Sequence, residues 1–178
     1  MNDFPINWSR LNRWAFVVIL IYVLSGCNSA TTKTHVQRVI SRKIKLPDQI
    51  TRCDELSSSS CKSIMWISTK ECTGCRINTL PLYIDFFERT RDYLDFCVII
   101  STPYVTSFSQ KVDDLCLPFP VFFDGSDRIR RLNRHLPADS EYHFFLLDSS
   151  YHTLVVGDPI LNPDVEKMYD SLLDCAGR

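Results

Sequence analysis

The sequence has no excess of charge of either sign, since 20 Lys and Arg residues stand against 21 Asp and Glu residues. A formal net charge of −1 provides no basic surface for a nucleic-acid backbone, so we expect no nucleic-acid partner. The chain also lacks a glycine-rich phosphate loop, a G-x-S-x-G turn that would present a nucleophilic serine, and any internal repeat. These absences exclude the common nucleotide-binding and serine-hydrolase patterns.

Long apolar runs are missing as well. Residues 14–24 are apolar for only eleven positions, whereas a helix needs roughly 20 residues to cross a bilayer about 30 Å thick. Arg10 and Arg13 precede this run, which is the layout of a secretory signal peptide. We therefore predict a signal peptide at residues 1–26 rather than a permanent membrane span.

The end of this run, Leu24-Ser25-Gly26-Cys27, resembles the lipobox of bacterial lipoproteins. The resemblance implies cleavage before Cys27 and acylation of Cys27, and several acyl chains on one residue anchor a protein stably to a membrane. We expect residues 27–62, which are polar and mixed, to form a lipid-anchored N-terminal linker that faces the periplasm of a bacterial cell envelope. The chain length of 178 residues predicts a single domain, at residues 63–178.

Cysteine, by contrast, is abundant, with eight in the chain. This number favours an oxidising compartment in which disulfides persist. Cys72 and Cys75 form a C-x-x-C that follows the strand-like residues 64–67 and opens an amphipathic helix. The unpaired amides and positive end of a helix N-terminus stabilise a thiolate, so we predict that Cys72 attacks a disulfide and Cys75 resolves the product.

The order of the other cysteines along the chain does not decide how they pair. Cys53 and Cys61 flank a serine run and could form a disulfide, or they could join the C-x-x-C as four zinc ligands. Cys97 lies in the apolar run 96–100 and is expected to pack as an inert core residue. We expect a monomer, in which at least one of the five cysteines outside Cys27 and the dithiol is unpaired: Cys53, Cys61, Cys97, Cys116 and Cys175.

Apolar runs and helical periodicity predict a mixed sheet flanked by helices. The predicted strands are residues 64–67, 96–100 and 119–124, followed by a hairpin of 144–148 and 153–157. The predicted helices are one from the C-x-x-C with a bend at Pro81, then 105–115, 127–136, and a last helix that Asp164 can cap. The succession of strand, helix and strand predicts that the first two strands are parallel. Four arginines are expected on a solvated face of the 127–136 helix rather than in an anion site: Arg128, Arg130, Arg131 and Arg134.

Several of these segments resemble the thioredoxin superfamily, most of all the membrane-associated TlpA/ResA-type thiol-disulfide oxidoreductases of bacterial envelopes. The resemblance is carried by the strand before Cys72-Thr73-Gly74-Cys75, by Phe119-Pro120-Val121 ending at Asp124, by Phe145-Leu146-Leu147-Asp148, and by Gly157 and Pro159. Residues 157–169 also resemble small lipoproteins of Bacteroidetes. The family implies an α/β thioredoxin-like fold, in which helices flank a central mixed sheet. It also implies the extra strand–helix insertion that is typical of TlpA/ResA-type proteins.

The same resemblance implies thiol-disulfide exchange through Cys72 and Cys75, with no bound cofactor and no metal. The implied partners are exported proteins with thiols or disulfides, an electron donor of unknown identity, and the membrane through the lipid anchor.

Three departures from the family pattern bear on this activity. Glu71 stands where tryptophan is common, and a carboxylate beside Cys72 would raise the pKa of its thiol. Pro81 stands six residues past Cys75, rather than the usual five. The family's cis-proline, which faces the dithiol, is missing, and the matching positions hold Tyr142 and His143. We name these two as candidate substrate-binding residues.

The departures leave two other functions open. A chain that kept the fold and lost catalysis would be a binding or structural lipoprotein. Alternatively, His143 beside Cys72 and Cys75 would form a Cys-Cys-His set suited to copper or zinc.

Overall fold

The structure, a computed structural model, describes residues 36–51 and 61–176. All of these except Val36 and Gln37 belong to one compact unit that begins at Arg38. The predicted signal peptide, the predicted lipidation site Cys27 and the possible disulfide partner Cys53 lie outside the described residues. Within the described ranges, no helix combines the length and the hydropathy that a membrane span requires.

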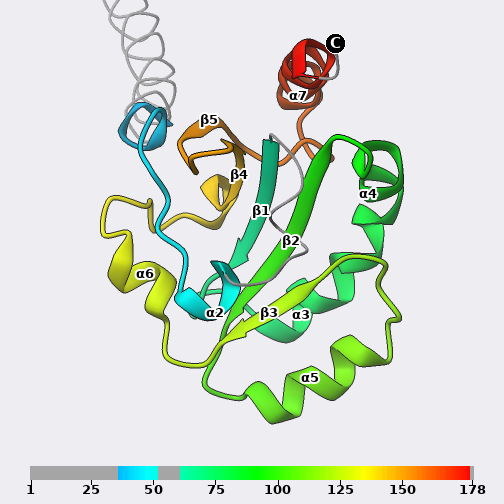
Figure 1. The fold of residues 1–178 in the computed structure, drawn as a ribbon. Coiled ribbons are helices and arrows are strands. Elements are labelled where there is room, and N and C mark those ends of the chain that lie inside the picture. The colour runs from blue at the N-terminus through cyan, green and yellow to red at the C-terminus, as the bar shows by residue number, and fades with distance from the viewer. Residues whose placement is uncertain (1–35, 52–60, 177–178) are drawn as a thin grey trace, which may run out of the picture. The chain divides into compact units, whose positions relative to one another are not determined.

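A five-stranded sheet in the order β3-β2-β1-β4-β5 forms the centre of this unit (Figure 1). Its middle strands are β1 (Cys61–Ile67) and β2 (Leu94–Ser101), and every residue of both is buried. They pair in parallel, as the sequence predicts, with Ile64 opposite Cys97. Cys97 is thus a core residue, as expected. Continuous burial of both strands requires cover on both faces of the sheet.

The remaining strands flank this pair. β3 (Val121–Asp124) adds a parallel strand beside β2, while β4 (Phe144–Asp148) lies antiparallel to β1 and pairs with β5 (Thr153–Val156) as the predicted hairpin. The sheet is therefore mixed, as predicted. β3 and α6 (Arg128–Leu132) come between β2 and β4 in the chain. That they form the strand–helix insertion of the TlpA/ResA type stays a prediction.

The helix after β1 is interrupted at Pro81, where the bend was predicted. It consists of α3 (Thr73–Thr79), a 3-10 turn η2 (Leu80–Tyr83) and α4 (Ile84–Thr90). Proline has no N–H to donate and its ring clashes with the preceding helical turn, which favours the tighter turn here.

These helices cover one face of the sheet with an aromatic cluster. The ring centroids of neighbouring members lie 4.9 to 6.2 Å apart. The members are Tyr83, Phe86, Phe96, Phe119, Phe144 and Tyr169. Side chains alternate along a strand, so Ile64 and Trp66 of β1 point to the other face.

Two helix predictions need correction. The helix predicted at 127–136 ends at Leu132, because the backbone of Asn133 leaves the helical conformation. Asp164 does not cap the last helix, α7 (Pro163–Ala176); its own N–H donates to Asn162 Oδ1 at 3.0 Å, so Asn162 fills that role. The remaining elements are α2 (Asp48–Thr51), α5 (Val105–Asp113) and the 3-10 turn η3 (Ser140–Tyr142).

Residues 38–51, which the sequence analysis assigned to the polar linker, pack against the sheet. Val39, Ile44 and Ile50 are buried. The backbone of Lys43 bridges that of His152 in antiparallel fashion. Among the described residues the folded unit therefore begins well before the predicted domain boundary at residue 63.

Candidate active site

Cys72 and Cys75 lie where the carboxyl end of β1 meets the start of α3. Cys72 is the N-cap residue of α3, and Cys75 lies in its first turn. The two are joined in a disulfide, with their Cα atoms 5.3 Å apart, and both residues are exposed. The structure therefore brings the two predicted cysteines together at an accessible helix end.

The local conformation of Cys72 follows from its place at the helix start. Its backbone is extended, its side chain makes no capping hydrogen bond, and its carbonyl accepts the N–H of Arg76 at 3.0 Å. A residue in this position leaves the first N–H groups of the helix free to face a negative charge. A thiolate formed on reduction would meet these donors and the positive end of the helix.

Glu71, the residue before Cys72, is held by three groups. Its Oε1 accepts the N–H of Ser68 at 2.8 Å and lies 3.4 Å from His143 Nδ1. Its Oε2 lies 3.2 Å from Nε of Arg76. Burial raises the pKa of Glu71, but the hydrogen bonds from His143 and Ser68 and the charge of Arg76 outweigh burial, so the pKa lies below its ordinary value.

This pairing changes the expected effect of Glu71 on the dithiol. The sequence predicts a carboxylate that opposes a thiolate at Cys72. In the structure the carboxylate forms an ion pair with Arg76 and contacts His143, so much of its charge is balanced locally.

Tyr142 and His143, the predicted substrate-binding residues, are both buried, with 8% and 2% of their surface exposed. They end η3 and lead into β4, and the carbonyl of His143 accepts the N–H of Trp66 at 2.8 Å. The His143 ring lies against Trp66, with ring centroids 4.2 Å apart. No peptide bond within residues 36–51 and 61–176 is cis. A role of these residues in substrate binding stays a prediction.

Neither metal-ligand set considered for the sequence is formed. Both ring nitrogens of His143 are engaged, Nδ1 facing Glu71 and Nε2 lying 2.9 Å from the carbonyl oxygen of Pro137. Cys61 opens β1 whereas Cys72 follows its end, and a strand of seven residues separates its ends by about 20 Å. Within the part of the chain that is described, no cluster of three His, Cys, Asp or Glu side chains suits a metal ion.

Similarity to solved structures identifies the fold. A candidate thiol-disulfide oxidoreductase from Bacteroides vulgatus matches with a TM-score of 0.53 and 16% identity, over 67% of this chain and 77% of that chain. A candidate thiol:disulfide interchange protein DsbE from Chlorobium tepidum matches with a TM-score of 0.52 and 13% identity, over 67% of this chain and 83% of that chain. The chain has the thioredoxin-like fold. No family model matches the sequence, and no curated protein matches it either.

In this thioredoxin-like fold a buried polar chain, which the sequence did not predict, lies at the carboxyl ends of β1, β2 and β3. Nε1–H of Trp66 donates to Ser101 Oγ at 3.0 Å, and that hydroxyl donates to Asp124 Oδ2 at 3.4 Å. The N–H of Ile129 donates to the same carboxylate oxygen at 2.9 Å. Ser101 and Asp124 are paired in register at the carboxyl ends of β2 and β3. The available signal in the sequence was a polar residue at the end of each of two successive apolar runs, Ser101 and Asp124.

Arg130 is an exception to the predicted solvated arginine face. Its guanidinium carbon lies 4.8 Å from the ring centroid of Trp66, and its Nε lies 3.7 Å from Asp127 Oδ2. The other three arginines are exposed, as predicted: Arg128, Arg131 and Arg134.

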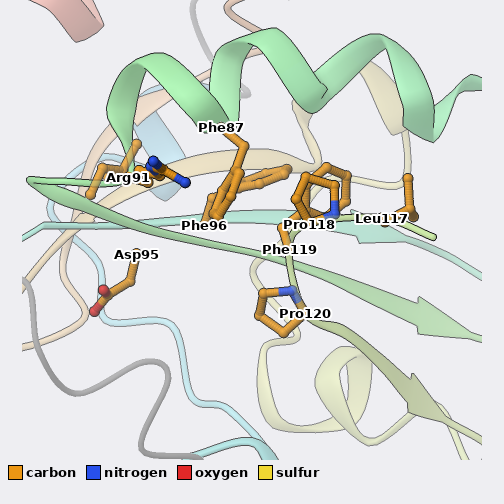
Figure 2. Close-up of a pocket in the computed structure, with 9 residues that line it drawn as sticks. Phe87, Arg91, Asp95, Phe96, Leu117, Pro118, Phe119 and Pro120 are labelled. Atoms are coloured by element: carbon orange, nitrogen blue, oxygen red, sulfur yellow. The ribbon is translucent and has the colours of Figure 1, made fainter.

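A separate cavity of about 510 Å³ opens near the amino ends of β2 and β3 (Figure 2). Phe87, Phe96 and Phe119 line its interior, and Arg91 and Asp95 lie at one end. Asp95 forms a buried ion pair with Lys62 at 3.5 Å. Its lining comes from the end of α4, the start of β2 and the residues before β3, so it is not part of the dithiol site.

Proposed function

We propose that the chain catalyses thiol-disulfide exchange on exported proteins in a bacterial cell envelope, where a lipid on Cys27 anchors it. The observation that carries this proposal is the exposed Cys72–Cys75 pair, close enough to be bonded, at the N-terminus of α3. The thioredoxin-like fold supports it, since both matched structures are named for thiol-disulfide chemistry. The location is supported by the lipobox-like Leu24-Ser25-Gly26-Cys27 and by the eight cysteines.

In the reducing direction the Cys72 thiolate attacks one sulfur of a partner disulfide. A bond forms between Cys72 and that sulfur, the partner's S–S bond breaks, and the other sulfur leaves as a thiolate that takes a proton from water. The Cys75 thiolate then attacks Cys72, closes the Cys72–Cys75 disulfide and releases the partner's second thiolate. Two electrons and two protons pass to the partner, and a dithiol donor must then reduce the disulfide of this chain.

A turnover assay tests the proposal. The full chain, purified in detergent, should accelerate the reduction of insulin disulfides by dithiothreitol, and Cys72→Ser should remove this acceleration. Cys116→Ser is a matched control, because Cys116 is also exposed but lies in the turn after α5, outside the C-x-x-C. A Cys72→Ser variant that kept the wild-type rate would refute the proposal.

Trapping tests the assigned roles of the two cysteines. In Cys75→Ser, a partner attacked by Cys72 cannot be released by the second thiol, so a mixed disulfide with exported proteins should accumulate. The double variant Cys72→Ser, Cys75→Ser is the control and should trap none. Equal trapping by both variants would show that another cysteine reacts.

A further inference from the structure

His143 is a buried ionisable side chain that contacts Glu71, the residue before Cys72, and the exchange chemistry above does not use it. His143 directly precedes β4 and is 2% exposed. Three parts of the chain contact its ring: Trp66 of β1, Glu71 of the loop before α3, and the carbonyl of Pro137. These contacts define which ring nitrogens carry protons.

The contact at Nε2 requires a proton on that nitrogen. Nε2 lies 2.9 Å from the carbonyl oxygen of Pro137, and a carbonyl oxygen can only accept a hydrogen bond. The ring therefore donates through Nε2. In a neutral imidazole the other nitrogen, Nδ1, would then present a lone pair.

The contact at Nδ1 favours a second proton on the ring. Nδ1 lies 3.4 Å from Oε1 of Glu71, and the same oxygen accepts the N–H of Ser68 at 2.8 Å. Arg76 holds the other oxygen at 3.2 Å, so the carboxylate is in the setting that favours its ionised form. A lone pair facing this carboxylate would be repelled, whereas a second N–H would donate to it.

The other charges around the ring are accounted for as well. Arg76 of α3 lies behind Glu71 and is paired with it. Arg130 of α6 lies over the Trp66 ring and forms an ion pair with Asp127. Glu71 is thus the carboxylate in contact with the ring, and the aromatic face of Trp66 also favours a cationic neighbour.

We propose that His143 is a positioning residue of the dithiol site, an imidazolium that holds Glu71 and offsets its charge beside Cys72. This inference rests on the proposed function. When Cys72 releases its proton to solvent, the thiolate forms next to a compensated ion pair instead of an unbalanced carboxylate. Removing the positive charge from position 143 should therefore lower the thiolate population of Cys72 about tenfold near neutral pH, as expected for one added charge at a neighbouring residue.

Nuclear magnetic resonance of the unmodified full chain tests the protonation directly. At pH 7 the ¹⁵N shifts of both His143 ring nitrogens should be those of protonated nitrogens, with His143→Gln assigning the signal among the four histidines. A neutral ring with an unprotonated Nδ1 would overturn the proposal. If His143→Gln does not fold, variants of the other three histidines assign their own signals. The remaining signal then belongs to His143.

Alkylation kinetics test the coupling to Cys72. In a reduced Cys75→Ser background, trypsin releases residues 71–76 as a peptide, since Lys70 and Arg76 bound it, and Cys72 is then its single thiol. His143→Gln should slow alkylation of this thiol by iodoacetamide about tenfold at pH 7. His143→Gln combined with Glu71→Gln should restore the rate to within about twofold of the parent, because no carboxylate charge remains to be offset.

The matched control is His152→Gln, which removes a histidine that also faces a carboxylate, Asp148 at 3.5 Å, but at the other end of β4. It should leave the alkylation rate of Cys72 unchanged. An unchanged rate in His143→Gln, or equal slowing with and without Glu71→Gln, would overturn the proposal, since a purely structural role predicts no dependence on Glu71. Neither readout uses disulfide reduction, so failure here is distinct from failure of the turnover assay.

Discussion

Replacing Asn133 by Ala should loosen the segment that precedes β1 from the rest of the domain. Asn133 is 1% exposed, and its side chain hydrogen-bonds both the N–H and the carbonyl of Lys45. Its Oδ1 accepts the N–H of Lys45 at 2.8 Å, and its Nδ2 donates to the Lys45 carbonyl at 2.8 Å. Nδ2 also donates to the carbonyl of Ile129 at 2.7 Å. Alanine removes all three hydrogen bonds and leaves the backbone of Lys45 without these partners.

The expected loss in the free energy of unfolding is about 2–4 kcal/mol. A neutral hydrogen bond contributes about 0.5–1.5 kcal/mol net, and three are lost here. Lys45 is an exposed residue and its two hydrogen bonds to Asn133 are only partly buried, so the loss stays below the full cost of burying unpaired groups.

Urea unfolding followed by tryptophan fluorescence measures this loss, and hydrogen exchange at the Lys45 amide reports where it occurs. The amide of Lys45 should exchange faster in Asn133→Ala, while amides of β1 and β2 should follow only the global change in stability. Asn78→Ala, at an exposed position of α3, is the control and should stay within about 0.5 kcal/mol of the wild type. A loss below about 0.5 kcal/mol in Asn133→Ala, with unchanged exchange at Lys45, would refute the reasoning.

Two further predictions concern Glu71 and Gly157. The pKa of Glu71 is lower in the folded state than its ordinary value of 4.5, so ionised Glu71 stabilises the fold above about that pH, and this contribution is lost as the pH falls through the folded pKa. Between about pH 6 and pH 3 the melting temperature of the wild type should therefore fall more steeply than that of Glu71→Gln. Parallel curves of melting temperature against pH would contradict this. Gly157 has φ +129°, and an added Cβ would lie 2.9 Å from Val165 Cγ2, so Gly157→Ala should destabilise by about 2 kcal/mol or more. Gly74→Ala, whose nearest atom would be 3.6 Å away, is the control and should not destabilise; equal effects of the two in urea unfolding would refute the steric argument.

Local sequence patterns were sufficient for most of the elements. The apolar runs that became β1 and β2, the bend at Pro81 and the hairpin of β4 and β5 are each encoded within about ten residues, as runs, periods or a proline. The parallel pairing of β1 and β2 follows because a helix that connects two strands of one sheet has one favoured crossover geometry.

The assignment of residues 38–51 to a linker missed contacts between distant segments. The segment 38–51 was assigned to a linker because its own composition is polar, yet Asn133, 88 residues away from Lys45, fixes its backbone. The α6 helix ends early at the same residue, whose side chain bonds the carbonyl of Ile129. The packing of residues 38–51 has no signal in the local period, because Lys45 and Asn133 lie on segments that meet only on folding.

The sequence by itself determined that two cysteines stand at the junction of a buried strand and a helix, because the apolar run, the C-x-x-C spacing and the helical period are all local. Only the tertiary structure decided which charged and ionisable groups surround them. Glu71 was predicted to oppose a thiolate, but Arg76 lies one helical turn beyond Cys72, and His143 reaches Glu71 from 72 positions further along the chain. The balance of charge at the dithiol depends on distances in space, and those distances are set by how β4 packs against β1.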